Sequence, residues 1–360
     1  MKERRILVWY WSATGGGGSR FAINLSRRLA KRYGPGAIRL SLHADDPLLA
    51  AANSEPNLET LAAPVATNRR QPLRTLLKLS ESARVLAEHV RDCDAVIVPM
   101  NFANAAPLAG ALRQPLAYFA HDPEPHPGDH AALAQRATQA VLISKASRVV
   151  ALSHYAANEL KRLGVAEQKL ATVPLSAVFE PRARAPREPG PLRLLFAGRM
   201  MAYKGLDMLA DALPMIAGRD DWRLTIAGEG PALDRAMRDR LAHPLVEIAP
   251  AWLSDAALDA KIAACDILLA PYRSATQSGV AAQALAHGRP AIVTPVGALP
   301  EQVGQGAAGW CAQAANGDAF GEALVQALKD DKAWDAKSKG ASEMASHAWD
   351  ADHWAWLDTM

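Results

Sequence analysis

Short apolar strands that end in glycine-containing turns and lead into helices recur along this chain, and they constrain its fold more than any other feature. In the clearest case, the strand Leu194–Gly198 is followed by Arg199 and then by Lys204; a second runs from Pro271 to Gly279. A strand that leads into a helix N-terminus brings free backbone N–H groups and the positive end of the helix dipole to one place. Two such places and two cations predict a diphosphate site, and therefore a nucleotide-linked substrate.

The length and composition of the chain limit the classes of protein to consider. A chain of 360 residues, half of them hydrophobic, is long enough for two domains. Its formal net charge of +3 is too small to predict a nucleic-acid partner. Residues 1–11 lack the pattern of a signal peptide, no apolar run approaches the ~20 residues of a membrane span, and the three cysteines fit reduced thiols. We therefore expect a cytoplasmic protein.

The first half of the chain predicts a parallel α/β sheet. Residues 5–11 form an apolar run that is followed by the glycine run 15–18 and an amphipathic helix to Tyr33, which is typical of doubly wound folds. A strand is expected at 37–42, and the polar, proline-containing residues 43–72 are expected to form a long loop. Four later apolar runs, at 94–99, 116–120, 147–152 and 170–173, predict further strands.

The second half repeats this pattern after a predicted linker. Residues 181–191 contain four prolines and several arginines, which is typical of a linker. Strands are then predicted at 192–197, 222–227, 266–271 and 291–293. A short internal sequence similarity links the halves, since residues 92–99 resemble residues 264–271. The tryptophan-rich residues 341–360 predict a terminal helix packed on the protein.

The glycine run after the first strand has three interpretations. Its spacing does not fit the dinucleotide-binding pattern, and no acidic residue clearly follows the second strand, so a nicotinamide cofactor is disfavoured. We favour a loop in which the backbone of Gly16, Gly17 and Gly18 approaches a ligand, and a plain flexible loop is the alternative.

His121 and Asp122 follow the predicted strand 116–120. Residues at the carboxyl ends of parallel strands line the ligand crevice of such folds, so this pair is a candidate substrate contact. Glu124 or His126 would orient the loop. A zinc site lacks a second cluster of ligands with suitable spacing, and we expect no metal and no cofactor.

In the second half, the candidate donor site contains cations, glycines and polar side chains at strand ends. Arginine offers a fork for phosphate oxygens and lysine a point charge, so Arg199 and Lys204 are the strongest candidates. Either Thr276 or Ser278 is expected to cap the following helix. The further candidates are Gly198, Gly228, Glu229, Gln277, Gly279, Val280, Gln283 and Glu301.

The order of these motifs resembles the family-four retaining glycosyltransferases of the GT-B fold. The resemblance is carried by Gly-Arg…Lys-Gly at 198–205, Ala-Gly-Glu-Gly-Pro at 227–231, Ala-Cys-Asp-Ile…Pro at 264–271 and Gln-Ala-Leu-Ala-His-Gly-Arg-Pro at 283–290. It implies an N-terminal acceptor domain (1–180), a C-terminal nucleotide-sugar domain (181–340) and a C-terminal helix (341–360) that returns to the first domain. Both domains would be Rossmann-like and would face a cleft.

The resemblance also implies roles for single residues. Arg199 and Lys204 would hold the diphosphate of the donor, and the backbone around Ser278, Gly279 and Val280 would hold phosphate and sugar. His121 would contact the sugar near the reacting carbon. Gly16, Gly17, Gly18 and Asp122 would lie on the acceptor side. The implied reaction moves a hexose from a nucleoside-diphosphate sugar to an acceptor hydroxyl with retention.

One departure from the family pattern keeps other functions open. The family has two glutamates eight positions apart, and this chain has Ala275 and Gln283 there. Gln283 can still bond ribose hydroxyls, whereas Ala275 cannot replace a carboxylate that contacts the sugar; Thr276 or Gln277 would have to do so. A non-catalytic sugar-nucleotide-binding relative and a GT-B epimerase are therefore the alternatives.

The acceptor is inferred from a basic stretch at 69–91, in which Arg69, Arg70, Arg74 and Lys78 alternate with leucines. Such a helix fits two arrangements equally, either resting on anionic lipid at the inner membrane face or packing on its own domain. The expected partners are a nucleoside-diphosphate sugar and a saccharide or lipid-linked acceptor, as in bacterial-type polysaccharide or glycolipid assembly.

Overall fold

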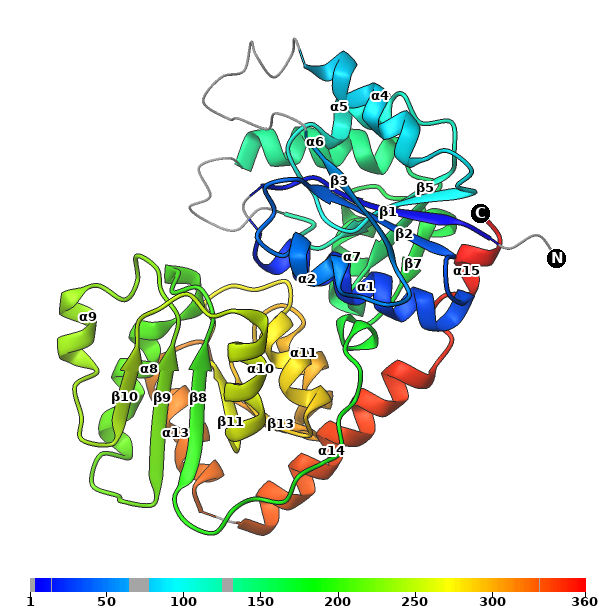
Figure 1. Cartoon of the computed structure of the whole chain (residues 1–360). Helices are drawn as coiled ribbons and strands as arrows, with labels where there is room; N and C mark the ends of the chain where they lie inside the picture. The colour runs from blue at the N-terminus through cyan, green and yellow to red at the C-terminus, as the bar shows by residue number, and fades with distance from the viewer. Residues whose placement is uncertain (1–3, 14, 65–77, 125–131, 330) are drawn as a thin grey trace. The chain divides into compact units, whose positions relative to one another are not determined.

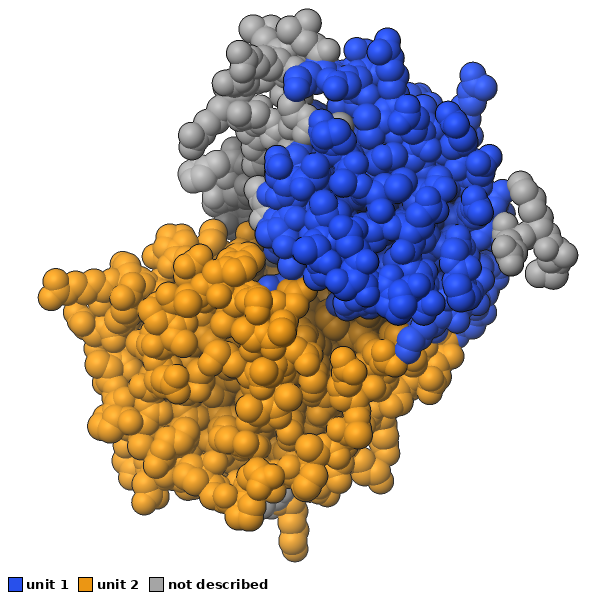
Figure 2. Space-filling model, viewed as in Figure 1, with its two compact units in different colours: residues 1–173, 352–360 blue, residues 174–351 orange. Residues whose placement is uncertain are grey.

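The computed structural model describes residues 4–13, 15–64, 78–124, 132–329 and 331–360. Residues Met1–Val173 and Asp352–Met360 form unit 1, and residues Pro174–Ala351 form unit 2 (Figure 2). The chain therefore passes between the units twice. The first passage falls seven residues before the division that we placed at 180/181, because the short helix η2 (Leu175–Val178) packs on helices of unit 2.

Unit 1 is an α/β domain (Figure 1). Its strands are β1 (Ile6–Tyr10), β2 (Ile38–His43), β3 (Glu59–Ala63), β4 (Ala95–Val98), β5 (Leu116–Ala120), β6 (Arg148–Ala151) and β7 (Leu170–Thr172). Its described helices are α1 (Gly17–Tyr33), α2 (Leu49–Asn53), α4 (Leu79–His89), α5 (Ala105–Ala109), α6 (Ala132–Lys145), α7 (His154–Arg162), η1 (Glu167–Lys169) and α15 (Ala355–Asp358).

The sheet of unit 1 is parallel throughout and has the order β3-β2-β1-β4-β5-β6-β7. Its winding reverses between β1 and β4, and a ligand crevice of a doubly wound sheet lies outside the carboxyl ends of such a pair. The predicted strands β1, β2, β4, β5, β6 and β7 and the helix α1 after the glycine run are confirmed, whereas β3 was not predicted. The described part of the predicted basic stretch forms α4, with Lys78 as its N-cap. Arg69, Arg70 and Arg74 lie outside the described residues, so the basic character of this helix stays a prediction.

The predicted long loop at 43–72 is wrong over its described part. This segment contains α2 and β3, and β3 pairs with β2 from Arg39↔Glu59 to His43↔Ala63. β3 is the last strand at its edge of the sheet and only Ala63 in it is buried. Its sequence therefore lacks the apolar pattern by which the buried strands were recognised.

Unit 2 has the same architecture (Figure 1). Its strands are β8 (Leu192–Ala197), β9 (Trp222–Ala227), β10 (Val246–Ala249), β11 (Ile267–Ala270), β12 (Ala291–Val293) and β13 (Gly309–Cys311), in the parallel order β10-β9-β8-β11-β12-β13. Its described helices are η2 (Leu175–Val178), η3 (Ala202–Lys204), α8 (Leu206–Ala212), η4 (Leu213–Met215), α9 (Arg235–Arg240), α10 (Asp255–Ala264), α11 (Gly279–Ala286), α12 (Leu299–Gln302), η5 (Gly304–Gly306), α13 (Gly317–Ala327) and α14 (Asp331–Asp350).

The two faces of the unit 2 sheet are each covered by a core. Successive side chains of a strand point to opposite faces, and β8 shows this directly. Leu194 and Phe196 pack with residues of α8 and α13, whereas Leu195 and Ala197 pack with residues of α10 and α11. Burial on both faces explains why these strands read as continuous apolar runs. The predicted α/β fold with two Rossmann-like domains is confirmed.

The sequence similarity between residues 92–99 and residues 264–271 corresponds to a repeated structural element. Asp94 and Asp266 precede β4 and β11, the strands beyond the reversal of each sheet. The Asp94 carboxylate accepts from the backbone N–H of Arg5 at 2.9 Å, and that of Asp266 accepts from Arg193 N–H at 2.8 Å. In return, each aspartate N–H donates to the carbonyl of the same arginine at 2.7 Å. Each aspartate thus joins the starts of two central strands.

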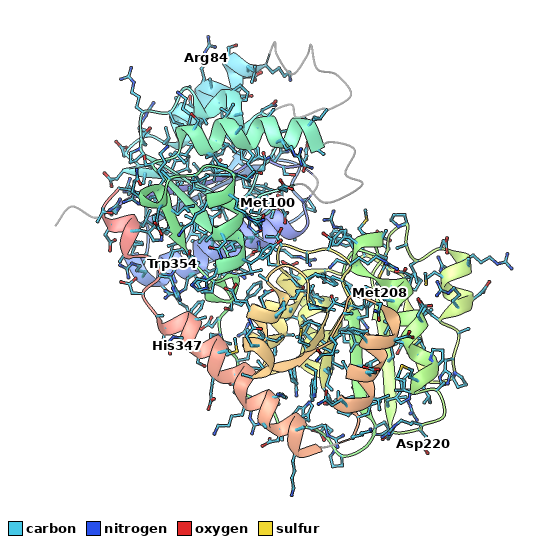
Figure 3. The ribbon with its side chains drawn as sticks, turned by 180° about the vertical axis from the view of Figure 1, so that it is seen from behind. Arg84, Met100, Met208, Asp220, His347 and Trp354 are labelled. Carbon is cyan, nitrogen blue, oxygen red and sulfur yellow. The ribbon has the colours of Figure 1, made fainter. Side chains whose placement is uncertain are left out.

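Residues 352–360 belong to unit 1. The terminal helix predicted at 341–360 differs from the structure, in which α14 ends at Asp350 and residues 352–360 form a separate segment with α15. Trp354, labelled in Figure 3, is fully buried and lies beside Phe119 of β5. Arg32 pairs with Asp352 at 2.7 Å and with Asp358 at 2.6 Å.

Within the described residues, no helix has the length and apolar character needed to cross a membrane.

We predict that Trp354→Ala lowers the free energy of unfolding by about 3–5 kcal/mol, because it empties a fully buried aromatic site. Denaturant titration followed by circular dichroism measures this loss. The matched control is Trp252→Ala, at a side chain that is 53% exposed, for which we expect a change within about 0.5 kcal/mol. Equal effects of the two substitutions would contradict the packing role of the C-terminal segment.

Candidate functional site

The loops after β8 and β11 meet where the winding of the unit 2 sheet reverses. The β8 loop contains η3 and leads into α8, and the β11 loop leads into α11. They are joined through the backbone, because Arg273 N–H donates to the Tyr203 carbonyl at 2.7 Å. Gly205 has a φ of +69°, and a Cβ there would lie 1.7 Å from the Pro271 carbonyl oxygen. This glycine is therefore required for the close approach of the loops.

Lys204 places a buried ammonium group between these loops. Its side chain is only 8% exposed, and its Nζ donates to the Tyr272 hydroxyl at 2.6 Å. Nζ also lies 4.3 Å from the centroid of the Tyr272 ring. Burial by itself would lower the pKa of Lys204. The hydroxyl oxygens of Tyr272 and Tyr203 have a larger opposite effect, so the pKa of Lys204 lies above its ordinary value. Lys204 is therefore positively charged at neutral pH.

Ser278 caps α11 and is held on several sides. Its hydroxyl oxygen accepts from Ala281 N–H at 3.2 Å and lies 3.1 Å from the Tyr272 hydroxyl. The amide of Gln302 bonds both the N–H and the carbonyl of Ser278, at 2.8 and 3.1 Å. Of the two caps considered, the structure has Ser278. The N–H groups of Gly279 and Val280, in the first turn of α11, have no acceptor among the described residues.

The N-terminus of α11 lies close to Gly198 and Lys204 at the carboxyl ends of β8 and β11. A Cβ built at Gly198 would lie 3.6 Å from Lys204 Nζ and 3.8 Å from Val280 Cγ2, while the space in front of Gly279 is open. Arg199 is exposed, and its charge acts on Lys204. It forms no ion pair within the described part of the chain. Two cations and two helix N–H groups are thus gathered at the carboxyl ends of the central strands β8 and β11. This arrangement is suited to a diphosphate.

The remaining predicted donor residues surround this point or lie next to it along the chain. Gly228 contacts Gly198, since a Cβ on Gly228 would lie 2.0 Å from the Gly198 carbonyl oxygen. Glu229 is exposed after β9, and Thr276 is buried. The Thr276 carbonyl accepts from Ala298 N–H, just before α12, which carries Glu301. Gln277 lies beside the cap residue and is partly buried.

The two positions that depart from the family pattern have different surroundings. Ala275 is buried and its carbonyl faces Gly297, so the backbone there is tightly packed. Gln283 Nε2 donates to Asp259 of α10 at 3.1 Å, and His287 bonds the same carboxylate oxygen at 2.8 Å. The amide nitrogen of Gln283 is therefore used inside unit 2, and its role toward ribose stays a prediction.

The other predicted residues form a second group at the carboxyl edge of the unit 1 sheet. Gly16 is the N-cap of α1, and a Cβ at Gly18 would lie 2.1 Å from the Tyr10 hydroxyl. His121 follows β5, packs on Phe21 of α1 with ring centroids 4.3 Å apart, and bonds the Pro99 backbone. Burial lowers the His121 pKa to about 4, so the imidazole is neutral at pH 7. Asp122 is next to it and is partly buried; His126 lies outside the described residues.

An acidic residue does follow the second strand, contrary to the sequence interpretation. Asp46 is 4% exposed, accepts from the Ser19 hydroxyl at 2.6 Å and bonds Leu48 N–H at 2.9 Å. Both carboxylate oxygens of Asp46 are thus bonded within unit 1, one of them to the first turn of α1. The glycine run is tethered by this carboxylate.

The sequence reasoning missed Tyr272 and Gln302. Tyr272 directly follows Pro271, so its place after a strand at the sheet edge was a usable signal. Gln302 lies beyond the next strand and had no such signal. Among the described residues, no group of three or more His, Cys, Asp or Glu side chains is arranged to hold a metal ion. The expectation of a metal-independent site stays a prediction.

Comparison with known proteins identifies the fold class. Anabaena Alr3699/HepE, solved in complex with UDP, superposes with a TM-score of 0.72 at 16% sequence identity, and 99% of each chain is covered. Together with the two Rossmann-like units, this likeness shows the GT-B fold. Residues 15–176 match the model for Glycosyltransferase Family 4, and residues 191–330 match that for Glycosyl transferases group 1. The chain belongs to these family-four, group 1 glycosyltransferases.

Two curated relatives are similar over part of their sequences. The GDP-mannose-dependent alpha-(1-6)-phosphatidylinositol dimannoside mannosyltransferase of Mycobacterium tuberculosis is 35% identical over 164 residues, which cover 42% of each chain. The D-inositol 3-phosphate glycosyltransferase of Pseudarthrobacter chlorophenolicus is 30% identical over 200 residues, which cover 53% of this chain and 46% of that protein. The chain thus matches less than half the length of these relatives.

We predict that Gly205→Ala destabilises the protein by at least about 1–3 kcal/mol, because alanine is strained at this φ and its Cβ meets the Pro271 carbonyl. The control is Gly218→Ala, at which a Cβ would meet no atom within 4 Å. Denaturant titration of both variants measures the difference. Equal stabilities would show that the two loops do not depend on Gly205.

We predict that His121 makes stability fall as the pH is lowered from 6.5 toward 4. The unfolded chain binds a proton at this imidazole near pH 6.5, whereas the folded chain binds it only near pH 4. Between pH 7 and 4.5 the loss is about 2 kcal/mol. His121→Gln removes this part of the pH dependence, which denaturant titration at the two pH values measures. An unchanged difference between pH 7 and 4.5 would contradict a partly buried His121 that is neutral at pH 7.

Proposed function

We propose that this protein transfers a hexose from a nucleoside-diphosphate sugar to an acceptor hydroxyl, with retention at the anomeric carbon. The observation that carries the proposal is the buried Lys204 ammonium, which is fixed beside the N-terminus of α11 where the sheet order reverses. Among the described residues Lys204 has no carboxylate partner, and a cation held in place in this way suits the diphosphate of a donor.

The residues of this edge match the chemical demand of the reaction. The bond from the anomeric carbon to the diphosphate breaks, the bond to the acceptor oxygen forms, and the acceptor proton passes to the leaving diphosphate in a front-face reaction. Negative charge grows on the diphosphate during this step. Preorganised donors aimed at such charge stabilise the transition state, by about 3 kcal/mol for one donor. Lys204, Arg199 and the α11 N–H groups would supply them.

His121 and the α1 N-terminus would serve the sugar and the acceptor. A neutral imidazole both donates and accepts hydrogen bonds, as contact with a sugar hydroxyl requires. The names of the relatives favour a mannosyl donor and an acceptor with an inositol phosphate group. GDP-mannose is therefore the first donor to test, followed by UDP sugars because the Anabaena structure contains UDP. A lipid-linked acceptor and contact with a membrane surface stay predictions.

A non-catalytic sugar-nucleotide binder is the second candidate, and Ala275 favours it. This buried alanine occupies the position of a carboxylate that contacts the donor sugar in the family. A thermal-shift panel of nucleoside diphosphates and their sugar conjugates identifies the donor in both cases. Transfer or hydrolysis of that donor by the purified protein excludes the second candidate, whereas stabilisation without any turnover supports it.

We predict that Lys204→Met lowers kcat/KM for the donor about a hundredfold or more, because one preorganised donor to the diphosphate is lost. Methionine keeps much of the buried stem, so the folded fraction is checked by circular dichroism. Lys339→Met is the control, since this lysine is exposed on α14 and pairs only with Glu343 among the described residues. An unchanged rate for Lys204→Met would overturn the assignment of Lys204.

A further inference from the structure

We infer that Tyr272 is a positioning residue that fixes the Lys204 ammonium and directs the Ser278 hydroxyl hydrogen toward a bound diphosphate. This inference rests on the proposed function. Tyr272 is 3% exposed and lies between the two groups, with its hydroxyl 2.6 Å from Lys204 Nζ and 3.1 Å from Ser278 Oγ.

The chemistry of the groups fixes the first hydrogen bond, and the inference assigns the second. A lysine ammonium has three hydrogens and no acceptor, so the Tyr272 oxygen must accept from Lys204. Either hydroxyl can donate in the Tyr272–Ser278 bond, and the inference assigns the single hydroxyl hydrogen of Tyr272 to Ser278. Ser278 Oγ also accepts from Ala281 N–H, so both of its lone pairs are used. Its own hydrogen is therefore left to be donated to a ligand at the start of α11.

The same bonds keep the ammonium available to a ligand. One N–H of Lys204 is used by Tyr272, and the face of the Tyr272 ring supports the charge at 4.3 Å. No second acceptor for this ammonium is found in the described part of the chain, so two of its hydrogens remain for phosphate oxygens. Without the Tyr272 hydroxyl, the flexible lysine stem would gain rotamers that point its charge elsewhere. Donors that are fixed before the charge develops stabilise a transition state more than mobile ones.

Tyr272 can be tested because the loops do not depend on its hydroxyl. They are joined by the backbone bond from Arg273 to Tyr203, by the Arg273–Asp207 ion pair and by the contact of Gly205 with Pro271. Phenylalanine keeps the ring, its packing on Tyr203 and its face toward Lys204. Tyr272→Phe therefore removes the two polar bonds and leaves the loop contacts in place.

The experiment compares Tyr272→Phe, Ser278→Ala and the double variant with the wild type. The measurements are kcat and KM for the donor found by the panel, and binding of the corresponding nucleoside diphosphate by calorimetry. We expect Tyr272→Phe to lower kcat about tenfold to a hundredfold, with a smaller change in KM, because charge grows in the transition state. The double variant should lose less than the product of the single losses, since both residues belong to one hydrogen-bonded chain.

The matched control is Tyr33→Phe, which removes a hydroxyl bonded to Asp358 in unit 1 at 2.6 Å. It loses a hydrogen bond of similar length and should keep kcat unchanged. If the wild type transfers the sugar and Tyr272→Phe keeps kcat unchanged, the inference about Tyr272 is overturned and the proposed function stands. Fully multiplicative losses in the double variant would have the same meaning. A wild type that neither binds nor turns over any donor in the panel would overturn the proposed function, and the role of Tyr272 with it.

Discussion

The reversal of strand order in each sheet is the constraint on which the rest of the structure depends. Helices on opposite sides of the reversal cover opposite faces, so the loops that lead into them start side by side at the carboxyl ends of two neighbouring strands. In both units the two strands at this point are joined at their starts by an aspartate, Asp94 or Asp266, that bonds the backbone of an arginine on or before the neighbouring strand. The aspartate contacts lie at the amino ends of the strands in each sheet. The loops at the carboxyl ends of the strands are left for binding.

Much of the fold could be predicted from the sequence, because strands buried on both faces form unbroken apolar runs. The edge strand β3 could not, since only Ala63 in it is buried and its backbone pairing with β2 leaves no apolar signature. The same limit applied to the site. Lys204 and Ser278 were recognised by their places after a strand and before a helix. Their connection through Tyr272 depends on a contact between residues 68 positions apart, which no local pattern records. Asp46 was missed because its role is set by Ser19 at the start of α1.

The two candidate groups differ in their electrostatics. The unit 2 edge gathers fixed positive charge from Lys204, Arg199 and the start of α11. At the unit 1 edge, the first turn of α1 is bonded to the carboxylate of Asp46, and burial keeps His121 neutral. An anionic leaving group suits the first edge and uncharged sugar hydroxyls suit the second. The proposed division of labour between donor and acceptor follows from this contrast in charge, independently of any family pattern.

The return of residues 352–360 to unit 1 affects how the protein is made. Unit 2 is continuous in sequence, so its core is complete once residue 351 has been synthesised. Most of unit 1 precedes unit 2 along the chain, but unit 1 lacks Trp354 and the two aspartate partners of Arg32 until residues 352–358 have been synthesised. Its apolar surface beside Phe119 must stay uncovered while the whole of unit 2 is translated. Unit 1 is therefore finished only after the whole of unit 2, and synthesis that stops before Trp354 would leave the unit 1 core open.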